Sequence, residues 1–213
     1  MKFKISYTCM FSLIFILANS TYSQENPEIV FEDNFSQDVL ESRSISRGEW
    51  SIKENMASSI WSKESAVKSP KGFKRSHKIA WNAEFDNGSI EMQVHTKDIK
   101  SILMGVDGKG HICYLTFNED SFKATVFPTD KVKGWVKKTN KYTTKDIPSV
   151  KAFKQNEWTD VKMTTKGNTL QLQIGDYNTT VEDIGFGRHK KSFAFNFTEG
   201  EVKIRNVKVT EIK

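Results

Sequence analysis

Apolar and polar residues alternate along most of the chain between residues 25 and 213. An alternation with a period of two places one set of side chains on a buried face and the other in water, which is typical of a β-strand. The clearest alternating segments are 29–31, 50–52, 79–85, 90–94, 102–106, 111–117, 122–126, 158–163, 170–174, 193–197 and 202–212. Only residues 37–44 fit a helical turn. Many short strands without a convincing helix predict an all-β fold, an antiparallel β-sandwich.

Turn-forming residues separate several of these segments. The strongest signals are Asn87-Gly88, Lys166-Gly167-Asn168 and Glu199-Gly200. Asn and Gly tolerate the left-handed backbone of tight turns, so each signal predicts a hairpin between the strands on either side. In the last segment the alternation changes phase between Ile204 and Val207, which predicts a β-bulge near Asn206.

The N-terminal residues, 1–23, have a different pattern. Lys2 and Lys4 precede an apolar run over residues 10–17, and small residues follow, including Ser20 and Ser23. This order is typical of a secretory signal peptide, cleaved after Ser20 or Ser23. The run is shorter than the roughly 20 apolar residues that span a bilayer, although an uncleaved anchor is the alternative. We therefore expect a secreted or periplasmic protein with no membrane segment after cleavage.

The rest of the chain, residues 25–213, has the size of a single domain and carries a mild charge. Removal of the signal peptide takes away Lys2 and Lys4 and leaves 30 basic and 26 acidic residues, a net charge of +4. A charge this small does not by itself indicate nucleic acid as a partner. Cys9 is removed as well, so Cys113 has no partner within the chain and no disulfide is predicted.

Three stretches of the sequence resemble concanavalin A-like jelly rolls. "EIVFEDNF" and "GEWSI" resemble the first strands of such domains, "EWTDVKMTTKGNTLQLQIGD" resembles a hairpin, and "FAFNFTEGEVKIRNVKVTEI" resembles the closing strands. The family that the chain resembles over residues 29–212 is the secreted 3-keto-disaccharide hydrolase-like family, a relative in fold of laminarinase-type glycoside hydrolases. The resemblance implies an exported bacterial protein that acts on carbohydrate or binds it.

Laminarinase-type enzymes carry Glu-x-Asp-x-Glu on one strand, and the nearest pattern in this chain is "IEMQVH". Retaining hydrolysis needs two carboxyl groups about 5 Å apart. Here Glu91 is followed at alternate positions by Gln93 and His95, so the carboxylate pattern is absent. The three side chains share one polar face, where Glu91 or His95 is a candidate general base beside a keto group and Gln93 a candidate sugar ligand. The alternative is a solvent-facing strand surface.

The segment "GKGHICYLTF" raises the question of a Cys/His nucleophile. Strict alternation predicts that His111 and Cys113 share a face with Leu115 and Phe117, while Tyr114 lies on the other face. Leu115 and Phe117 indicate that the cysteine face is the core. Since a reactive thiol must be exposed, we predict that Cys113 is a buried apolar group. Tyr114, and His111 at the rim of the strand, are predicted to contact sugar.

Two basic stretches contain aromatic residues, and the second of them, residues 131–145, carries Trp135 and Lys137. An aromatic ring can stack on a sugar ring, and nearby lysines attract carboxylate or sulfate groups. These residues predict a non-catalytic module for anionic polysaccharide as the second function, with a solvated loop as the alternative. Nucleic acid would use the same residue types, but export makes it a poor candidate.

No metal or cofactor site is predicted from residue spacing, because the four histidines share no ligand pattern. The family resemblance implies a possible structural calcium near the first strand, with Glu32 or Asp33 as a ligand. The leading prediction for function is a saccharide site on the concave face of the sandwich, around Glu91, His95 and Tyr114. A glycan-binding module is the second hypothesis, and a structural or accessory domain is the third.

Overall fold

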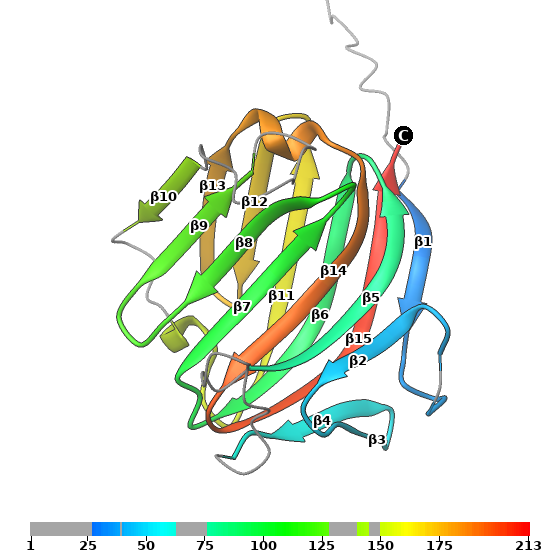
Figure 1. Ribbon diagram of the computed structural model, residues 1–213, viewed down its shortest axis with the longest axis vertical. Helices are drawn as coiled ribbons and strands as arrows, with labels where there is room; N and C mark the ends of the chain where they lie inside the picture. The colour runs from blue at the N-terminus through cyan, green and yellow to red at the C-terminus, as the bar shows by residue number, and fades with distance from the viewer. Residues whose placement is uncertain (1–26, 39, 63–75, 128–139, 145–149) are drawn as a thin grey trace, which may run out of the picture.

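The structure, a computed structural model, describes residues 27–38, 40–62, 76–127, 140–144 and 150–213 (Figure 1). Its strands form two antiparallel sheets that pack face to face, which confirms the predicted all-β sandwich of jelly-roll type. We call the sheet nearer the viewer in Figure 1 the front sheet and the other the back sheet. Two 3₁₀ helices, η1 (Val150–Ala152) and η2 (Ile184–Gly187), are the only helical elements among the described residues.

The back sheet has the strand order β13-β12-β11-β6-β15-β4-β3, and β1 also pairs with β15. Its strands are β1 (Pro27–Asp33), β3 (Ser51–Lys53), β4 (Met56–Ile60), β6 (Gly88–Lys97), β11 (Trp158–Lys166), β12 (Thr169–Ile174), β13 (Tyr177–Glu182) and β15 (Glu201–Ile212). The front sheet has the order β10-β9-β8-β7-β14-β5-β2. Its strands are β2 (Arg43–Arg47), β5 (His77–Phe85), β7 (Ser101–Asp107), β8 (His111–Phe117), β9 (Phe122–Val126), β10 (Asn140–Thr144) and β14 (Lys190–Thr198).

The core lies between the sheets and follows the alternation in the sequence. In β5 the buried side chains of Ile79 and Trp81 alternate with Lys78, Ala80 and other residues that face outward. Trp81 stacks on Phe193 of β14, with ring centroids 4.9 Å apart and the planes at 16°. The outward residues of each sheet therefore form two separate outer faces, the front face and the back face, on opposite sides of the molecule.

Two of the three predicted hairpins are wrong. Asn87-Gly88 joins β5 of the front sheet to β6 of the back sheet, and Glu199-Gly200 joins β14 to β15 in the same way. Both turns are corners of the sandwich, because the strands that they connect pair with other partners. The turn at Lys166-Gly167-Asn168 is a hairpin between β11 and β12, as predicted.

The remaining local predictions fare differently. The bulge near Asn206 is confirmed, since the pairing of β15 with β6 shifts between Arg205 and Lys208 and Asn206 has a φ of 54°. A helical turn was expected over residues 37–44. The described residues of this stretch contain one turn, which is closed by a hydrogen bond of 2.9 Å from the Arg43 N–H to the Leu40 carbonyl. Strand β2 begins at Arg43.

A buried ion pair connects the first strand to the front sheet. Arg43 Nη1 donates to both carboxylate oxygens of Asp33 at 2.9 Å, and Trp81 Nε1 donates to Asp33 Oδ2 at 2.9 Å. The Phe35 N–H donates to Asp33 Oδ1. These four bonds engage both carboxylate oxygens of Asp33. The structural calcium near the first strand, with Glu32 or Asp33 as a ligand, stays a prediction.

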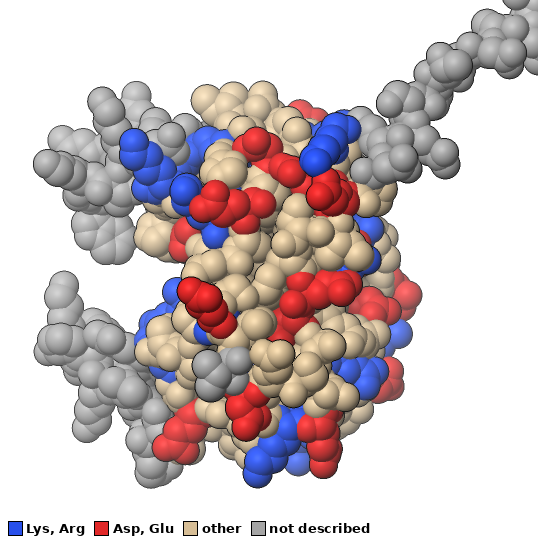
Figure 2. Space-filling model, turned by 90° about the vertical axis from the view of Figure 1, so that its right-hand side faces the viewer, with Lys and Arg blue, Asp and Glu red and all other residues tan. Residues whose placement is uncertain are grey.

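Charged side chains are mixed over the edge of the sandwich that carries β1, β2 and β5. Figure 2 shows acidic and basic residues interspersed on this edge. Such a surface does not point to one sign of ligand, so a site must be found residue by residue. Within the described part of the chain, no helix has the length and hydropathy of a membrane span.

Candidate functional site

The predicted polar row on β6 exists, and it lies on the back face. Glu91 Oε1 pairs with Lys162 Nζ at 2.9 Å, across the register between β6 and β11. Gln93 donates to Asp160 at 2.8 Å and accepts from Arg205 at 2.8 Å. Glu91 and Gln93 thus each have a cross-strand polar partner, which is the usual condition of a solvent-facing strand surface. The buried Nδ1 atom of His95 has no hydrogen-bond partner among the described residues.

His95 ends the row beside an aromatic residue. Its ring meets the edge of Trp158 at a centroid distance of 5.6 Å, and the Arg205 guanidinium lies over the Trp158 ring at 4.0 Å. A depression of about 360 Å³ opens over β6, β11 and β15, with Glu91 and Gln93 in its lining. Two acids, Glu91 and Asp160, border it, but each is held by a neighbouring side chain.

The prediction that His111 shares a face with Cys113 is wrong, and a bulge is the reason. In the pairing of β7 with β8, Val106 faces Cys113 and the next residue, Asp107, faces His111, so Ile112 is an extra residue. The extra residue is fully buried, and His111 is turned toward Tyr114. The predicted burial of Cys113 is confirmed, and burial raises the pKa of its thiol to about 12. Such a thiol is not a nucleophile at neutral pH.

Three rings form an aromatic cluster at one side of the front face. His111 and Tyr114 have centroids 4.8 Å apart, Tyr114 and Phe127 5.3 Å, and His111 and Phe127 5.7 Å. Arg188 Nη1 donates to the carbonyls of His111 and Phe127 at 3.0 and 2.6 Å, which fixes the backbone under two of the rings. His111 Nδ1 lies 2.7 Å from Asp107 Oδ1. We call His111, Tyr114 and Phe127 the aromatic cluster.

Beside this cluster, the front face carries a line of very small side chains. The strand registers align Tyr114 of β8, Gly105 of β7, Ala194 of β14 and Ala80 of β5 directly opposite one another. The Tyr114 ring lies against Gly105, where an added Cβ would be 3.2 Å from the ring. Since neighbouring strands are about 4.8 Å apart, the line from Gly105 to Ala80 extends for about 10 Å. We call Gly105, Ala194 and Ala80 the low row.

Two rows of longer side chains flank the low row, each displaced by two residues along the strands, about 7 Å. On one side the registers align the Asn82 row, which consists of Asp107, Ser192 and Asn82. On the other side they align the Lys78 row, which consists of Lys123, Thr116, Leu103, Asn196, Lys78 and Arg47. The front face thus has a strip of small side chains with an aromatic cluster at its β8 end and longer, mostly polar side chains along both sides.

The walls of this strip are held in place by hydrogen bonds. Arg47 Nη2 donates to Asn196 Oδ1 at 2.8 Å, and Asn196 Nδ2 donates to the Leu103 carbonyl at 3.2 Å. Burial, followed by the Asp107 carboxylate, raises the pKa of the Tyr114 phenol above its ordinary value. Tyr114 therefore stays a neutral O–H donor at every physiological pH.

The expected single site around Glu91, His95 and Tyr114 is wrong as a grouping. β6 belongs to the back sheet and β8 to the front sheet, so Tyr114 and His111 lie on the front face while Glu91, Gln93 and His95 lie on the back face. Trp135 and Lys137 lie outside the described residues. Among the described residues, no group of three or more His, Cys, Asp and Glu side chains is placed to hold a metal ion.

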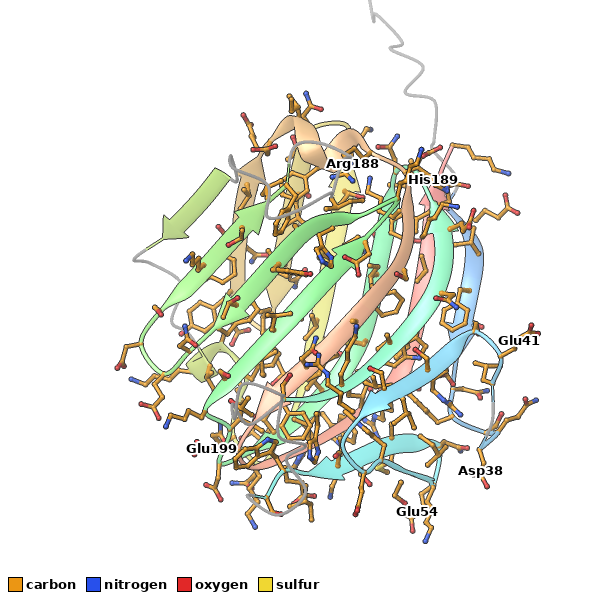
Figure 3. All side chains as sticks on the ribbon, in the orientation of Figure 1. Asp38, Glu41, Glu54, Arg188, His189 and Glu199 are labelled. Carbon is orange, nitrogen blue, oxygen red and sulfur yellow. The ribbon has the colours of Figure 1, made fainter. Side chains whose placement is uncertain are left out.

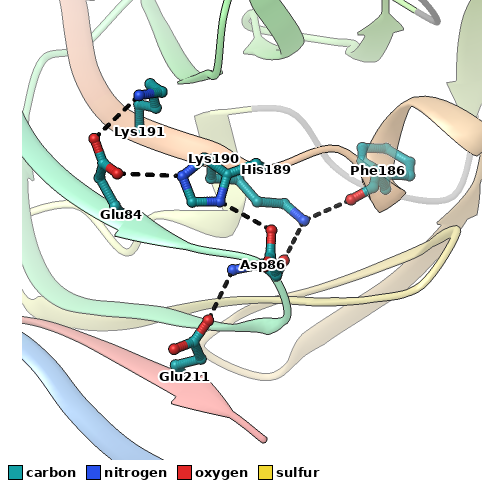
Figure 4. Close-up of polar contacts among 7 residues, drawn as sticks. All are labelled: Glu84, Asp86, Phe186, His189, Lys190, Lys191 and Glu211. Carbon is teal, nitrogen blue, oxygen red and sulfur yellow. Dashed lines mark hydrogen bonds and ion pairs between the residues drawn. The ribbon is translucent and has the colours of Figure 1, made fainter.

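A further polar cluster lies at the end of the sandwich where β14 begins, near Arg188 (Figure 3). His189 contacts Asp86 at 2.9 Å through Nδ1 and Glu84 at 3.3 Å through Nε2. The neighbouring Lys190 is fully buried and donates to the carbonyls of Asp86 and Phe186, both at 2.5 Å (Figure 4). Burial lowers the pKa of Lys190 to about 8. We call these residues the end cluster, and its contacts connect the ends of strands.

The front-face strip was missed at the sequence level, although the sequence contains a signal for it. Three strands have a glycine or alanine at the middle of their outward positions, with larger residues two places before and after. These outward triplets are Lys78-Ala80-Asn82, Leu103-Gly105-Asp107 and Ser192-Ala194-Asn196. The triplets lie far apart in the sequence, and only the strand order brings them side by side.

No protein-family model and no curated protein sequence matches this chain. Solved structures do share its fold. The CBM2 module of the evolved Dit protein of Lactobacillus casei BL23 phage J-1 superposes with a TM-score of 0.60 at 11% identity, covering 87% of this chain and 96% of that one.

Two glycan-degrading enzymes are similar in the same way. The GlcNAcα1-4Gal-releasing endo-β-galactosidase from Clostridium perfringens has a TM-score of 0.60 at 9% identity, over 86% of this chain and 62% of that one. An endo-acting O-glycanase from the human gut microbiota has a TM-score of 0.57 at 9% identity, and the match covers 88% of this chain and 91% of that one. At these identities the likeness shows the fold, a β-sandwich of the jelly-roll type.

Proposed function

We propose that this protein is an exported saccharide-binding β-sandwich and that it holds its ligand in the strip on the front face. The observation that supports this most strongly is the register line that places the Tyr114 ring at the end of the low row. A sugar ring has an apolar face that packs on an aromatic ring and a rim of hydroxyls that needs hydrogen-bonding partners. The strip offers an aromatic ring and hydrogen-bonding side chains within one or two strand spacings of each other.

Each wall of the strip has a suitable role. Tyr114 supplies a flat ring and a neutral O–H donor. The exposed Asn82 side chain presents an amide from one flanking row, and the small side chains of the low row allow a ring to approach the sheet. The fold is also that of a carbohydrate-binding module and of glycan-degrading enzymes, which agrees with the proposal. The N-terminal sequence supports export, since it has the order of a signal peptide.

The test is affinity electrophoresis of the protein against a panel of soluble neutral and acidic polysaccharides. We expect retardation by at least one of them, and we expect Tyr114→Ala to weaken it on the order of tenfold, which corresponds to about 1.4 kcal/mol of lost stacking and hydrogen bonding. Tyr177→Ala is the matched control, because Tyr177 is 42% exposed and lies on β13, away from the strip. Equal loss in both variants, or no loss in Tyr114→Ala, would contradict the proposed site.

A second candidate function is catalysis, and the hydrogen bond between His111 and Asp107 favours it. Asp107 orients Nδ1 of His111, which leaves Nε2 as the basic nitrogen beside the strip. A base of this kind can remove a proton from the carbon next to the carbonyl of a keto-sugar. This candidate keeps the chemistry of 3-keto-disaccharides that the sequence resemblance implies and moves the base from Glu91 or His95 to His111.

Turnover of a 3-keto-disaccharide by the purified protein and two variants tests the second candidate. His111→Gln is expected to lower the rate by about 10²- to 10⁴-fold, the usual contribution of a general base, and Glu91→Gln is expected to leave it unchanged. The reverse result would assign the base to the back face. Absence of turnover in the unaltered protein would leave binding as the function.

A further inference from the structure

The two rows that flank the low row differ in whether their amide side chains are engaged within the protein. In the Lys78 row, Asn196 is 5% exposed, and its two amide atoms are bonded to Arg47 and to the Leu103 carbonyl. In the Asn82 row, the Asn82 side chain is exposed and Ser192 is half-buried. Neither of these two side chains makes a hydrogen bond to another described residue. The Asn82 row therefore offers an amide and a hydroxyl to a ligand.

The position of the Tyr114 ring determines where a sugar would lie relative to these two groups. The ring lies against Gly105, where an added Cβ would be 3.2 Å from it, so a sugar that packs on the ring lies over the rest of the low row, beginning at Ala194. Ser192 precedes Ala194 by two residues on β14, and the register places Asn82 of β5 opposite Ser192. Since side chains two residues apart on a strand are about 7 Å apart, one edge of the sugar faces both groups.

An amide beside a hydroxyl suits neighbouring hydroxyl groups of a sugar. The Asn82 amide has a donor and an acceptor side by side, so it can bond two hydroxyls on adjacent ring carbons at once, and the Ser192 hydroxyl can donate and accept. We propose that the ligand of the strip is a saccharide whose in-chain units carry free hydroxyls on adjacent ring carbons, and that Asn82 and Ser192 bind these hydroxyls. This inference rests on the proposed saccharide site and adds the class of ligand and the residues that select it.

The experiment compares two groups of neutral polysaccharides in affinity electrophoresis and calorimetry. Glucans, galactans and mannans with 1,4- or 1,6-linkages keep free hydroxyls on adjacent ring carbons. Glucans and galactans with 1,3-linkages have no two adjacent free ring hydroxyls within the chain. We expect the protein to bind its best polymer of the first group about tenfold more tightly than any of the second group, because the second group loses the paired hydrogen bonds to the Asn82 row.

Two variants locate the effect. Asn82→Ala is expected to weaken binding of the first group about two- to tenfold, the range of one neutral hydrogen bond, and to leave binding of the second group unaffected. Asn178→Ala is the control, because it removes an exposed amide from β13 at the edge of the back sheet. Binding by this control is expected to equal that of the unaltered protein.

Three results would count against the inference. Equal binding of the two groups of polymers, or equal loss in Asn82→Ala and Asn178→Ala, would overturn it. Tyr114-dependent binding confined to the 1,3-linked polymers would overturn it while leaving the saccharide site in place. No Tyr114-dependent binding of any polymer would overturn both the saccharide site and the inference.

Discussion

At the residue scale, the buried pair of Arg43 and Asp33 shows how one strand is fastened to the opposite sheet. Their side chains are only 2% and 3% exposed. Arg43 also donates to the carbonyls of Gln37 and Asp38, at 2.6 and 2.8 Å, so the guanidinium satisfies backbone groups of the connection between β1 and β2. A buried charge of this kind is tolerable only while all its partners are present.

Removal of Arg43 should therefore be costly. We expect Arg43→Ala to lower the free energy of unfolding by about 3–5 kcal/mol, because Asp33 would be left buried without its counter-charge. Urea denaturation measures the change. Lys100→Ala is the control, since Lys100 and its partner Glu199 are 56% and 49% exposed and such a pair contributes at most about 1 kcal/mol. A loss in Arg43→Ala no larger than in the control would show that the pair does not fasten the strand.

Residue patterns also explain which local predictions succeeded. The burial of Cys113 could be predicted, because Cys113 is in phase with Leu115 and Phe117 in β8. The facing of His111 was predicted wrongly, because strict alternation from Cys113 assigns Ile112 to the outer face, whereas the bulge buries both Ile112 and Cys113. The two successive apolar residues were the mark of this bulge in the sequence, as the change of phase was for the bulge near Asn206.

At the element scale, the end cluster ties together strand ends that belong to different sheets. His189 lies where β14 begins, Glu84 is on β5, and Glu211 of β15 accepts from the Asp86 N–H at 3.0 Å. The hydrogen bond with Asp86 is the main cause that raises the pKa of His189, and the hydrogen bond with His189 is the main cause that lowers the pKa of Glu84. The raised pKa of His189 and the lowered pKa of Glu84 both favour the charged forms of these two side chains in the folded state.

The two pKa shifts predict how the stability of the fold depends on pH. Because the pKa of His189 is raised on folding, its contribution is fully present below its ordinary value of 6.5 and is lost as the pH rises through the folded value. Because the pKa of Glu84 is lowered, its contribution is present above its ordinary value of 4.5 and is lost as the pH falls through the folded value. The cluster should thus stabilise the fold most between about pH 4.5 and 6.5.

Urea denaturation of the protein and His189→Gln at pH 5.5 and pH 8.5 checks this prediction. The difference in unfolding free energy between the two proteins should be larger at pH 5.5 than at pH 8.5. A difference that is equal at both pH values, or larger at pH 8.5, would mean that the ionic contacts of His189 do not stabilise the fold.

Elements themselves were well predicted where one face is apolar, and connections were not. The eleven alternating segments correspond to strands. Four strands, β2, β4, β10 and β13, contain few large apolar residues and were missed. The signal at Asn87-Gly88 correctly marks a turn. It describes only the local backbone, however, and which sheet the next strand joins is decided by long-range pairing that no short motif encodes.

At the scale of the whole molecule, the two outer faces differ in what their side chains are engaged with. The back face carries mutually paired residues, such as Glu91 with Lys162 and Gln93 with Asp160. The front face carries a strip of small side chains between the Lys78 row, the Asn82 row and the aromatic cluster. The strip could not be predicted from the sequence, since residues from β5, β7, β8 and β14 meet only through the strand order 8-7-14-5.

The most direct test of the front-face site is a map of amide chemical-shift changes in the ¹⁵N-labelled protein on addition of an oligosaccharide from a polymer that it binds. The largest changes are predicted at Tyr114, Gly105, Ala194 and Ala80, with smaller changes along Asn82 and Lys78. Residues of the back face, including Gln93 and Lys162, are predicted to be unchanged. Changes centred on Gln93 and Lys162, with none at Tyr114 or Gly105, would contradict the account.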